Sequence, residues 1–349
     1  MTQPFFSICI PQYGRTDFVL KAIESLSAQR FRDFEICISD DRSWDRRQCE
    51  IVTALEESGL EYKVCVQLKN RRYDANLRCA IDLAQGRYCL LLGNDDALVD
   101  ESTLGRLYDL INAYAPCSVI VCDFQDYRSG SKANRVRLTG NKGAGAEIAV
   151  RHFRNFSFVS GVILERIAAQ AIATERWDGS EMYQIFIACR IIAGGGPLVE
   201  IGEPLIRKDI CLPNLSVDSY ATLPRVQRWP IVERTLPLAQ LGRLTADAVS
   251  PFISGIERRR LNARVLRQLL IYTYPFWLFE YRYVQSWPYA FGVALGMRPR
   301  RIAEGVELTN AGIAFVRLYY FVASLMGLIT PKWIFDVGKP LLYRFAKWV

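Results

Sequence analysis

Residues 6–15 have the sequence FSICIPQYGR, and the fold class can be worked out from this stretch. The run from Phe6 to Ile10 is apolar almost throughout, which predicts a strand buried on both faces of a sheet. Pro11 is expected to end this strand, because proline cannot donate a ladder hydrogen bond. A polar loop at residues 12–15 then follows. In open α/β sheets, ligands bind beyond the carboxyl ends of such strands.

Strand-like and helical patterns alternate from this stretch to residue 124. Short apolar runs predict strands at 34–39, 62–68, 88–92 and 118–124. Apolar residues at helical spacing between these runs predict helices at 17–29, 48–57, 75–84 and 102–113. This alternation predicts an α/β fold of the Rossmann-like kind, with a mostly parallel sheet and helices on both of its faces.

Acidic clusters follow two of these predicted strands. Asp40 and Asp41 come at the end of the second strand, and Asp95 and Asp96 follow the fourth. A single acidic turn has an ordinary structural explanation, because Asp favours turns and caps helices. Two clusters at one edge of a sheet bring like charges together, and a divalent cation would relieve their repulsion. We therefore expect a functional site at this edge.

Four motifs, in this order along the chain, resemble the opening of family 2 glycosyltransferases with the GT-A fold. They are residues 6–15, 26–29, 33–45 and 76–98. The resemblance covers roughly residues 5–215, and in its details the chain is similar to bacterial transferases that build O-antigen or capsule repeat units, including the abequosyltransferase-like group. It implies an inverting, metal-dependent enzyme that uses a nucleotide-sugar donor.

The resemblance also implies roles for residues at the sheet edge. Asp96 would bind the metal ion, Mg²⁺ or Mn²⁺, that bridges to the donor diphosphate. Asp95 would contact the ribose or the water shell of the metal, and Asp41 would recognise the nucleotide base. Pro11 and Tyr13 would contact the base and the ribose through backbone and ring. The structural alternatives are a helix cap, an Asx-turn and an ordinary packed turn.

Basic residues are expected near the donor diphosphate. Arg71, Arg72 and Arg78 lie between the third strand and the second acidic cluster, and Arg78 is assigned to the nucleotide-sugar site. Arg207 follows a predicted strand at 198–201, in a region where the family places a basic residue near the diphosphate. The structural alternative is that these arginines form part of the solvated surface.

The catalytic base is expected in the segment Trp177–Tyr183, before a predicted helix at 184–192. This segment resembles the Glu-Asp motif of the family, whose second acid removes a proton from the acceptor hydroxyl. Alignment on the glycine makes Glu181 the base and puts Ser180 at the first acid; Asp178 is the rival base. The structural alternative for both acids is favourable charge at a helix N-terminus.

Three positions depart from the usual family pattern: Gly14 stands where Asn is usual, Arg42 where Gly is common, and Gly93 where a first Asp is frequent. Two other functions therefore stay open. One is a polyprenyl-phosphate sugar synthase, which shares the fold. The other is a catalytically silent nucleotide-binding scaffold subunit, which Gly93 and Ser180 keep possible.

The basic excess of the chain lies entirely in its C-terminal part. Residues 1–220 hold 26 basic and 29 acidic side chains, a net charge of −3, and residues 221–349 hold 18 and 7, a net charge of +11. We therefore expect a GT-A domain over 1–220, with a nucleotide-sugar half at 1–105 and an acceptor half at 106–220. A basic, aromatic, helical and membrane-associating region at 221–349 would follow.

A basic and aromatic composition is typical of a membrane surface segment. A spanning helix needs about 18 nearly uncharged residues, and the longest charge-free runs have 12, 15 and 14 residues: 268–279, 283–297 and 318–331. We expect a peripheral protein on the cytoplasmic face of the bacterial inner membrane that binds an anionic membrane surface. Its acceptor would be a polyprenyl-diphosphate-linked saccharide, and nucleic acid is not expected as a partner. The alternative is a helical subdomain with a buried core.

The remaining signals are mainly structural. Half of the ten cysteines sit in strand-like apolar runs and no CxxC pair occurs, so reduced thiols in a cytosolic protein are expected. His152 is the single histidine, which makes a histidine-based zinc site or a Ser-His-Asp triad improbable. The first six residues lack the charged start of a signal peptide. The glycine-rich segment 129–146 is expected to be a mobile loop near the acceptor.

Overall fold

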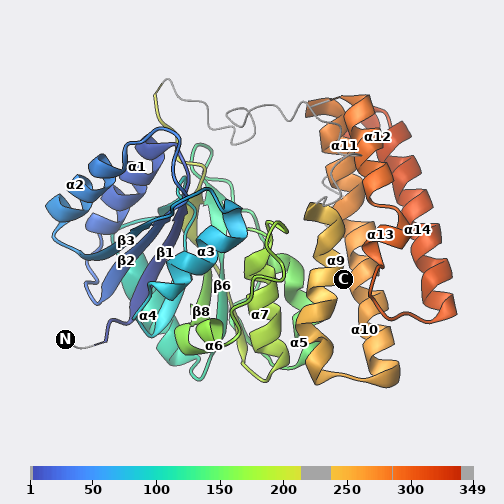
Figure 1. Cartoon of the computed structure of the whole chain (residues 1–349), viewed down its shortest axis with the longest axis horizontal. Helices are drawn as coiled ribbons and strands as arrows, with labels where there is room; N and C mark the ends of the chain where they lie inside the picture. The colour runs from blue at the N-terminus through green and yellow to red at the C-terminus, as the bar shows by residue number, and fades with distance from the viewer. Residues whose placement is uncertain (1–2, 214–236, 285, 339–349) are drawn as a thin grey trace. The chain divides into compact units, whose positions relative to one another are not determined.

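The computed structural model describes residues 3–213, 237–284 and 286–338 (Figure 1). The chain divides into two compact units, Met1–Pro224 and Arg225–Val349. The boundary that the charge pattern predicts, between residues 220 and 221, lies outside the described residues.

The first unit is built around one mixed sheet with the strand order β3-β2-β1-β4-β8-β6-β9-β5, and β7 pairs with β9. The strands are β1 (Phe6–Gln12), β2 (Phe34–Asp40), β3 (Glu61–Val66), β4 (Tyr88–Leu91), β5 (Ala97–Leu98), β6 (Val119–Asp126), β7 (Gly140–Gly143), β8 (Val162–Glu165) and β9 (Leu198–Lys208). Strands β1 to β4 are parallel to one another, whereas β8 is antiparallel to β4 and β6. The predicted α/β sheet is confirmed. Strands β5, β7 and β8 were not predicted.

Strand β1 continues beyond the proline that was expected to end it. Pro11 lies opposite Ser39 of β2, and the carbonyl of Gln12 accepts the N–H of Asp41 at 2.9 Å. On the other side, β4 pairs with β1 only as far as Cys9. Residues 9 and 11 face the same neighbour because the pleat repeats every two residues. The missing N–H of Pro11 therefore faces a position beyond the end of the β4 ladder.

Helices cover both faces of the sheet, as expected (Figure 1). On one face, α1 (Thr16–Ser27), α2 (Gln48–Ser58) and α4 (Thr103–Ala113) contribute side chains to the main apolar core. On the other face, α3 (Arg72–Asp82) packs on β1 and β2 and also contacts α6 (Arg166–Ala171) and α7 (Tyr183–Ala193). All residues of β1, β2 and β4 are buried. Burial on both faces explains why these strands read as continuous apolar runs.

The segment 129–146 is not simply a loop. It contains β7, which pairs with β9, and α5 (Ala146–His152) begins at its end, before the short helix η1 (Phe153–Phe156). Its glycines turn the chain rather than surround a ligand: Gly143 and Gly145 have φ angles of 86° and 100°. Glycine adopts this region at little cost because it lacks a Cβ atom.

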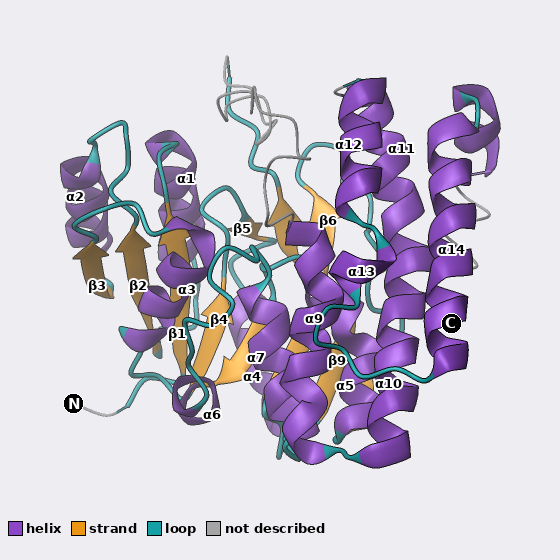
Figure 2. Cartoon of the chain, turned by 45° about the vertical axis from the view of Figure 1, so that its right-hand side comes forward, coloured by secondary structure: helices purple, strands orange, loops and turns teal. Residues whose placement is uncertain are grey.

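The described part of the second unit is helical. Its elements are α9 (Pro237–Val249), η2 (Ser250–Phe252), α10 (Gly255–Gln268), η3 (Leu269–Thr273), α11 (Tyr274–Val284), α12 (Trp287–Gly296), α13 (Pro299–Ile302) and α14 (Asn310–Ile329). Figure 2 shows α14 as a long helix of this unit.

Helix α14 is long and apolar enough to cross a membrane by length and composition. It has 20 residues, a mean hydropathy of 1.7 over its best window, and 17% of that window is buried. No single charge-free run contains this helix, because Arg317 interrupts its apolar sequence. The expectation of a tail that lies on a membrane surface therefore stays a prediction, with α14 as its longest apolar helix among the described residues.

Candidate active site

The turn Gly93–Asp96 follows β4 at the carboxyl edge of the sheet, and its two acids differ in their surroundings. Asp95 forms an ion pair with Arg15, which precedes α1, and its side chain is 17% exposed. Asp96 is 2% exposed; it accepts hydrogen bonds from the hydroxyl of Ser160 and, at 2.9 Å, from the N–H of Asp209. Asp96 is therefore enclosed by protein, and Asp95 is the more accessible acid.

The carboxyl groups of Asp95 and Asp96 are neighbours at this turn, and this affects the pKa of Asp96. Burial, together with the neighbouring carboxylate of Asp95, raises the pKa of Asp96 to about 8. Lys208 lies close by, but its ammonium group contacts Asp209 at 2.8 Å. Gly93 makes room for the pair, since a Cβ atom there would lie 2.9 Å from Asp96 Oδ2 and 3.2 Å from Asp95 Oδ1. A first acid at position 93 would crowd this turn, which gives a physical reason for that departure from the family pattern.

The two carboxylates of the turn suit a hard divalent cation that is also bound by substrate phosphates and waters. The described residues contain no group of three His, Cys, Asp or Glu side chains arranged to hold a metal ion. Mg²⁺, however, is usually bound by one or two carboxylates together with substrate phosphates and waters. Asp95 and Asp96 supply the carboxylates, and a cation would relieve the repulsion that raises the pKa of Asp96.

The loop after β1 forms hydrogen bonds with the two segments that carry the acidic clusters. The hydroxyl of Ser43 accepts the N–H of Gly14 at 2.7 Å, and Asn94 donates its amide to Gln12 Oε1 at 2.7 Å. Gly14 has a φ angle of 61°, and a Cβ atom there would overlap the indole ring of Trp44. Both features favour glycine at this position.

Tyr13 and Pro11 lie at this edge with different exposure. The Tyr13 ring is 40% exposed beside the loop, so it is available to a ligand. Pro11 is buried within β1.

Asp41 occupies a structural position. Its carboxylate accepts the N–H groups of Arg71 and Arg72 at 2.6 and 2.8 Å, and thereby holds the start of α3. Burial raises the pKa of Asp41. The residue is 2% exposed, which leaves little surface for contact with a nucleotide base.

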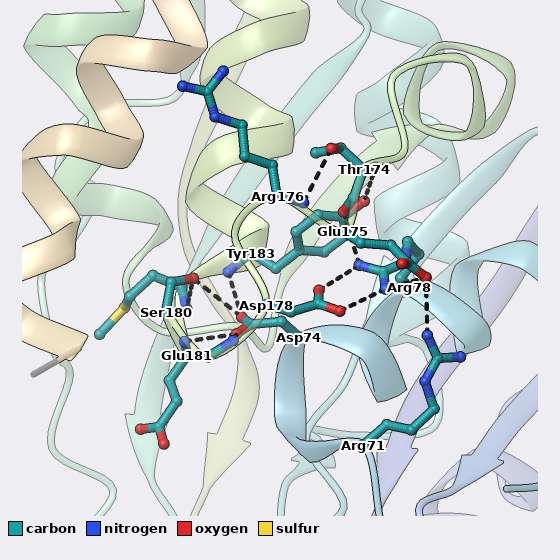
Figure 3. Close-up of polar contacts among 12 residues, drawn as sticks. Arg71, Asp74, Arg78, Thr174, Glu175, Arg176, Asp178, Ser180, Glu181 and Tyr183 are labelled. Carbon is teal, nitrogen blue, oxygen red and sulfur yellow. Dashed lines mark hydrogen bonds and ion pairs between the residues drawn. The ribbon is translucent and has the colours of Figure 1, made fainter. Parts of the chain in front are cut away.

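Arg78 and Asp178 pair with each other, which changes the interpretation of both. Arg78 Nη1 and Nη2 lie 2.6 and 2.9 Å from the two carboxylate oxygens of Asp178, and Nη1 also donates to the carbonyl of Thr174 at 2.8 Å (Figure 3). The Arg78 side chain is 9% exposed. The Arg78 guanidinium is thus nearly buried and paired in this structure, and its expected contact with the donor phosphate stays a prediction. Asp178 orients a loop, so it is poorly placed to act as the base.

Asp74 organises the loop that carries the proposed base. Its Oδ2 accepts the N–H groups of Gly179 and Glu181 at 2.8 and 2.9 Å, and its Oδ1 accepts the N–H of Tyr183 at 3.1 Å and the hydroxyl of Ser180 at 3.3 Å (Figure 3). Asp74 is 1% exposed, and burial raises its pKa. Ser180 thus has a structural function where the family often has an acid.

Glu181 lies on this loop, two residues before α7 begins at Tyr183. Figure 3 shows its carboxylate directed away from Asp74 and Asp178. The side chain is 49% exposed, with Arg72 Nη2 at 3.9 Å, and the backbone has a φ angle of 58°. A non-glycine residue in this region is strained, and such strain is often found at functional positions.

Arg207 lies on β9 opposite Ala97, the residue after Asp96. Its guanidinium sits over the ring of Tyr127 at 5.8 Å. The structure thus brings Arg207 to the acidic turn, as the sequence predicted for a basic residue on this side.

Four residues that contribute to the site were not assigned from the sequence: Arg15, Asp74, Arg135 and Ser160. Arg135 is partly buried and donates to the carbonyls of residues 122, 155, 158 and 160, and it thereby holds the segment that presents Ser160 to Asp96. Arg15 was visible in the first motif. The partners of the other three residues are distant in sequence, so no local signal marked them.

Comparison with known proteins identifies the domain. Residues 7–168 match the model of glycosyl transferase family 2. These residues run from β1 through the acidic turn to α6. Residues 7–168 form a glycosyltransferase domain of family 2. The matched region ends before the Asp74-bound loop, so the family match does not itself reach Glu181.

Sequence relatives are consistent with this family. The abequosyltransferase RfbV of Salmonella typhimurium is 26% identical over 229 residues, which are 57% of this chain and 65% of RfbV. The amylovoran biosynthesis glycosyltransferase AmsB of Erwinia amylovora is 29% identical over 92 residues, which are 26% of this chain and 31% of AmsB. The chain thus spans less than two thirds of the length of these relatives.

Solved structures share the fold. The S. aureus TarS fragment 1–349 in complex with UDP-GlcNAc has a TM-score of 0.63 at 13% identity, and the alignment covers 93% of this chain and 89% of that one. Mannosyltransferase PcManGT from Pyrobaculum calidifontis, in complex with GDP-Man and Mn²⁺, has a TM-score of 0.52 at 14% identity, covering 95% and 89%. At these identities the likeness shows the fold alone.

Proposed function

We propose that this protein is an inverting, metal-dependent glycosyltransferase that moves a sugar from a nucleotide-sugar donor to a lipid-linked saccharide in bacterial surface polysaccharide synthesis. The observation that carries the proposal is the acidic turn of the family 2 domain, in which the partly exposed Asp95 lies beside the buried Asp96 at the carboxyl edge of the sheet. The names of RfbV and AmsB support the class of product.

The donor would bind across the edge formed by β1, β2 and β4, in the half of the domain before residue 106. The exposed Tyr13 ring is suited to contact a base or ribose, and Asp41 would support this region by holding the start of α3. Arg15 and Arg207 are the arginines suited to the donor diphosphate, because both lie at the acidic turn. UDP-GlcNAc and GDP-Man in the complexes of TarS and PcManGT support a nucleotide-sugar donor.

Asp95 and Asp96 would hold Mg²⁺ or Mn²⁺, which when bound neutralises charge on the leaving diphosphate. We assign direct contact to Asp95, since it is the more accessible of the two. The buried Asp96 would maintain the shape of the turn and add negative charge near the cation. The Mn²⁺ in the PcManGT complex supports a metal in this fold.

Glu181 would act as the general base. Its carboxylate would take the proton from the acceptor hydroxyl as that oxygen forms a bond to the anomeric carbon. The bond from the anomeric carbon to the diphosphate oxygen breaks, and the nucleoside diphosphate leaves with the electron pair from the opposite face. Glu181 suits this task because a base must be both accessible and well positioned. Its side chain is exposed, and Asp74 fixes its loop by accepting the N–H of Glu181.

The acceptor would be a polyprenyl-diphosphate-linked saccharide at the cytoplasmic face of the inner membrane. The net charge of +11 over residues 221–349 supports contact with an anionic surface, and the exposed apolar helix α14 supports contact with lipid.

A thermal-shift screen against UDP, GDP, CDP and dTDP, each with Mn²⁺ or with EDTA, tests the donor site. One nucleotide should stabilise the protein only when Mn²⁺ is present, by about 2.7 kcal/mol at 100 times its Kd. Hydrolysis of the matching sugar nucleotide then separates the enzyme from a silent scaffold. Transfer to a bare polyprenyl phosphate, with none to a lipid-linked saccharide, would instead indicate a polyprenyl-phosphate sugar synthase.

A further inference from the structure

The helical unit contains a cavity of about 460 Å³ between α10 and the start of α14. The two helices contact each other within this unit (Figure 2). Its described lining consists of Arg260, Ala263, Arg264, Arg267, Thr309, Ala311, Gly312 and Phe315. The lining residues that the structure describes include no Asp or Glu. The described lining therefore carries three positive charges.

The three arginines are arranged on one side of α10. Arg260, Arg264 and Arg267 are spaced by four and three residues, which places them on the same face of a helix. The segment before α14 forms the opposite wall, and other residues of α10 bind this segment. Arg258 Nη1 pairs with Glu307 Oε1 at 2.9 Å, and Asn262 donates its amide to the carbonyl of Glu307 at 3.0 Å. These contacts fix the segment before α14, so the cavity is a built feature of the unit.

The start of α14 adds to the positive potential. Thr309 caps the helix by accepting the N–H of Gly312 at 3.0 Å. The N–H groups of the first helical turn lack acceptors within the helix, and the helix dipole is positive at this end. Together with three guanidinium groups, which match phosphate geometry, this wall is suited to an anion with several oxygen atoms.

An apolar surface begins at the same place. The outer side of α14 carries exposed apolar residues: Ile313, Phe315, Leu318, Phe321, Val322, Leu325, Met326 and Ile329. Phe315 belongs both to this surface and to the cavity. A phosphate ion in water needs no apolar surface beside its site, whereas a lipid presents a phosphate and a hydrocarbon chain together.

We infer that this cavity binds the phosphate or diphosphate group of a membrane lipid, whose hydrocarbon chain lies along the exposed side of α14. The inference rests on the membrane association proposed above and deepens it, because it assigns that association to a phosphate site rather than to diffuse positive charge. The lipid would hold the start of α14 at the level of the headgroups.

Vesicle flotation of the full chain tests the inference. Three phosphatidylcholine vesicles of equal size are compared: one with phosphatidic acid, one with polyprenyl phosphate, and one with cholesteryl hemisuccinate, whose charge is a carboxylate. The variant Arg267→Gln removes one cavity charge, and Arg259→Gln removes one charge from α10 outside the lining. We expect Arg267→Gln to weaken binding to phosphate-bearing vesicles by about fivefold, and Arg259→Gln to change it little.

The outcomes separate this inference from the proposal on which it rests. Selective binding to the two phosphate-bearing vesicles, lost in Arg267→Gln alone, supports the cavity, and stronger binding to polyprenyl phosphate assigns it to an acceptor-type lipid. Equal binding to all three vesicles, or equal losses in both variants, overturns the cavity and leaves membrane association intact. Flotation on none of the vesicles overturns both, while sugar-nucleotide hydrolysis continues to report on the family 2 domain.

Discussion

The carboxylate of Asp74 accepts the backbone N–H of Glu181 at 2.9 Å, although the two residues are 107 positions apart in the chain. The same carboxylate accepts the N–H groups of Gly179 and Tyr183. A buried acid in α3 thus sets the shape of the loop that presents the proposed catalytic base. The positions of Glu181 and of α7 depend on this one side chain.

Replacement of Asp74 by Asn should lower turnover while leaving donor affinity nearly unchanged. Asn keeps one acceptor oxygen but turns an N–H₂ group toward backbone donors, so the loop should lose about 1–3 kcal/mol of hydrogen bonding. A displaced base can cost about 10²-fold in rate. The measurement is kcat together with nucleotide Kd. Asp82→Asn, exposed at the end of the same helix, is the matched control. A fall in donor affinity that accounts for all of the lost activity would contradict a positioning role.

Glu181→Gln should reduce turnover by about 10²–10⁴ with little change in nucleotide Kd, since Gln keeps the size of the side chain but cannot accept the proton. Transfer rate and nucleotide Kd are measured for this variant and for Asp178→Asn. Near-normal turnover of Glu181→Gln would remove it from the role of base.

Asp178→Asn should act differently, because it breaks the ion pair with Arg78 rather than the chemistry. Arg78 is nearly buried, so loss of its partner should lower the free energy of unfolding, by about 1–3 kcal/mol. Chemical denaturation measures this change. A fully stable Asp178→Asn variant with turnover as low as that of Glu181→Gln would assign the base to Asp178.

The two acids of the metal turn should respond differently to amide substitution. Asp95→Asn should abolish Mn²⁺-dependent nucleotide binding without lowering stability, because Asp95 is partly exposed and paired only at the surface of the turn with Arg15. Asp96→Asn should also weaken Mn²⁺-dependent binding, with the fold retained, since Asn can still accept the N–H of Asp209. Calorimetric titration with Mn²⁺ and nucleotide measures both. Full Mn²⁺-dependent affinity in Asp95→Asn would exclude it as a ligand.

Glu200 predicts a pH-dependent contribution to stability. Burial acts to raise its pKa, but hydrogen bonds from His152 and Asn155, with Lys142 nearby, outweigh burial and hold the pKa below its ordinary value of 4.5. A lowered pKa means that the stabilisation is present above the ordinary value and is lost as pH falls through the folded-state value. Glu200→Gln should therefore be less stable than the wild type at pH 7, and the difference should shrink below about pH 4.5. Unfolding curves of both proteins over this range are the test, and a constant difference would contradict it.

The sequence by itself determined the elements that depend on local pattern. Apolar runs identified β1, β2 and β4, which are buried on both faces, and β6, which is buried over its first five residues. The same kind of pattern identified β3, although this strand lies at the edge of the sheet and is partly exposed. Apolar residues at helical spacing identified α1 to α4, because a helix that packs on a sheet buries apolar residues along one side. The order of the motifs was enough to predict the family and to direct attention to the acids beyond β4.

Only the tertiary structure decided what each acid does. Asp95 and Asp96 are neighbours in sequence, yet Ser160 and Asp209 enclose one while Arg15 leaves the other partly exposed. Asp178 is paired with Arg78, which is 100 residues away in the chain. Burial and hydrogen-bond partners set the charge and reach of a carboxylate, and both come from segments that are distant in the chain, so no local pattern could have revealed them.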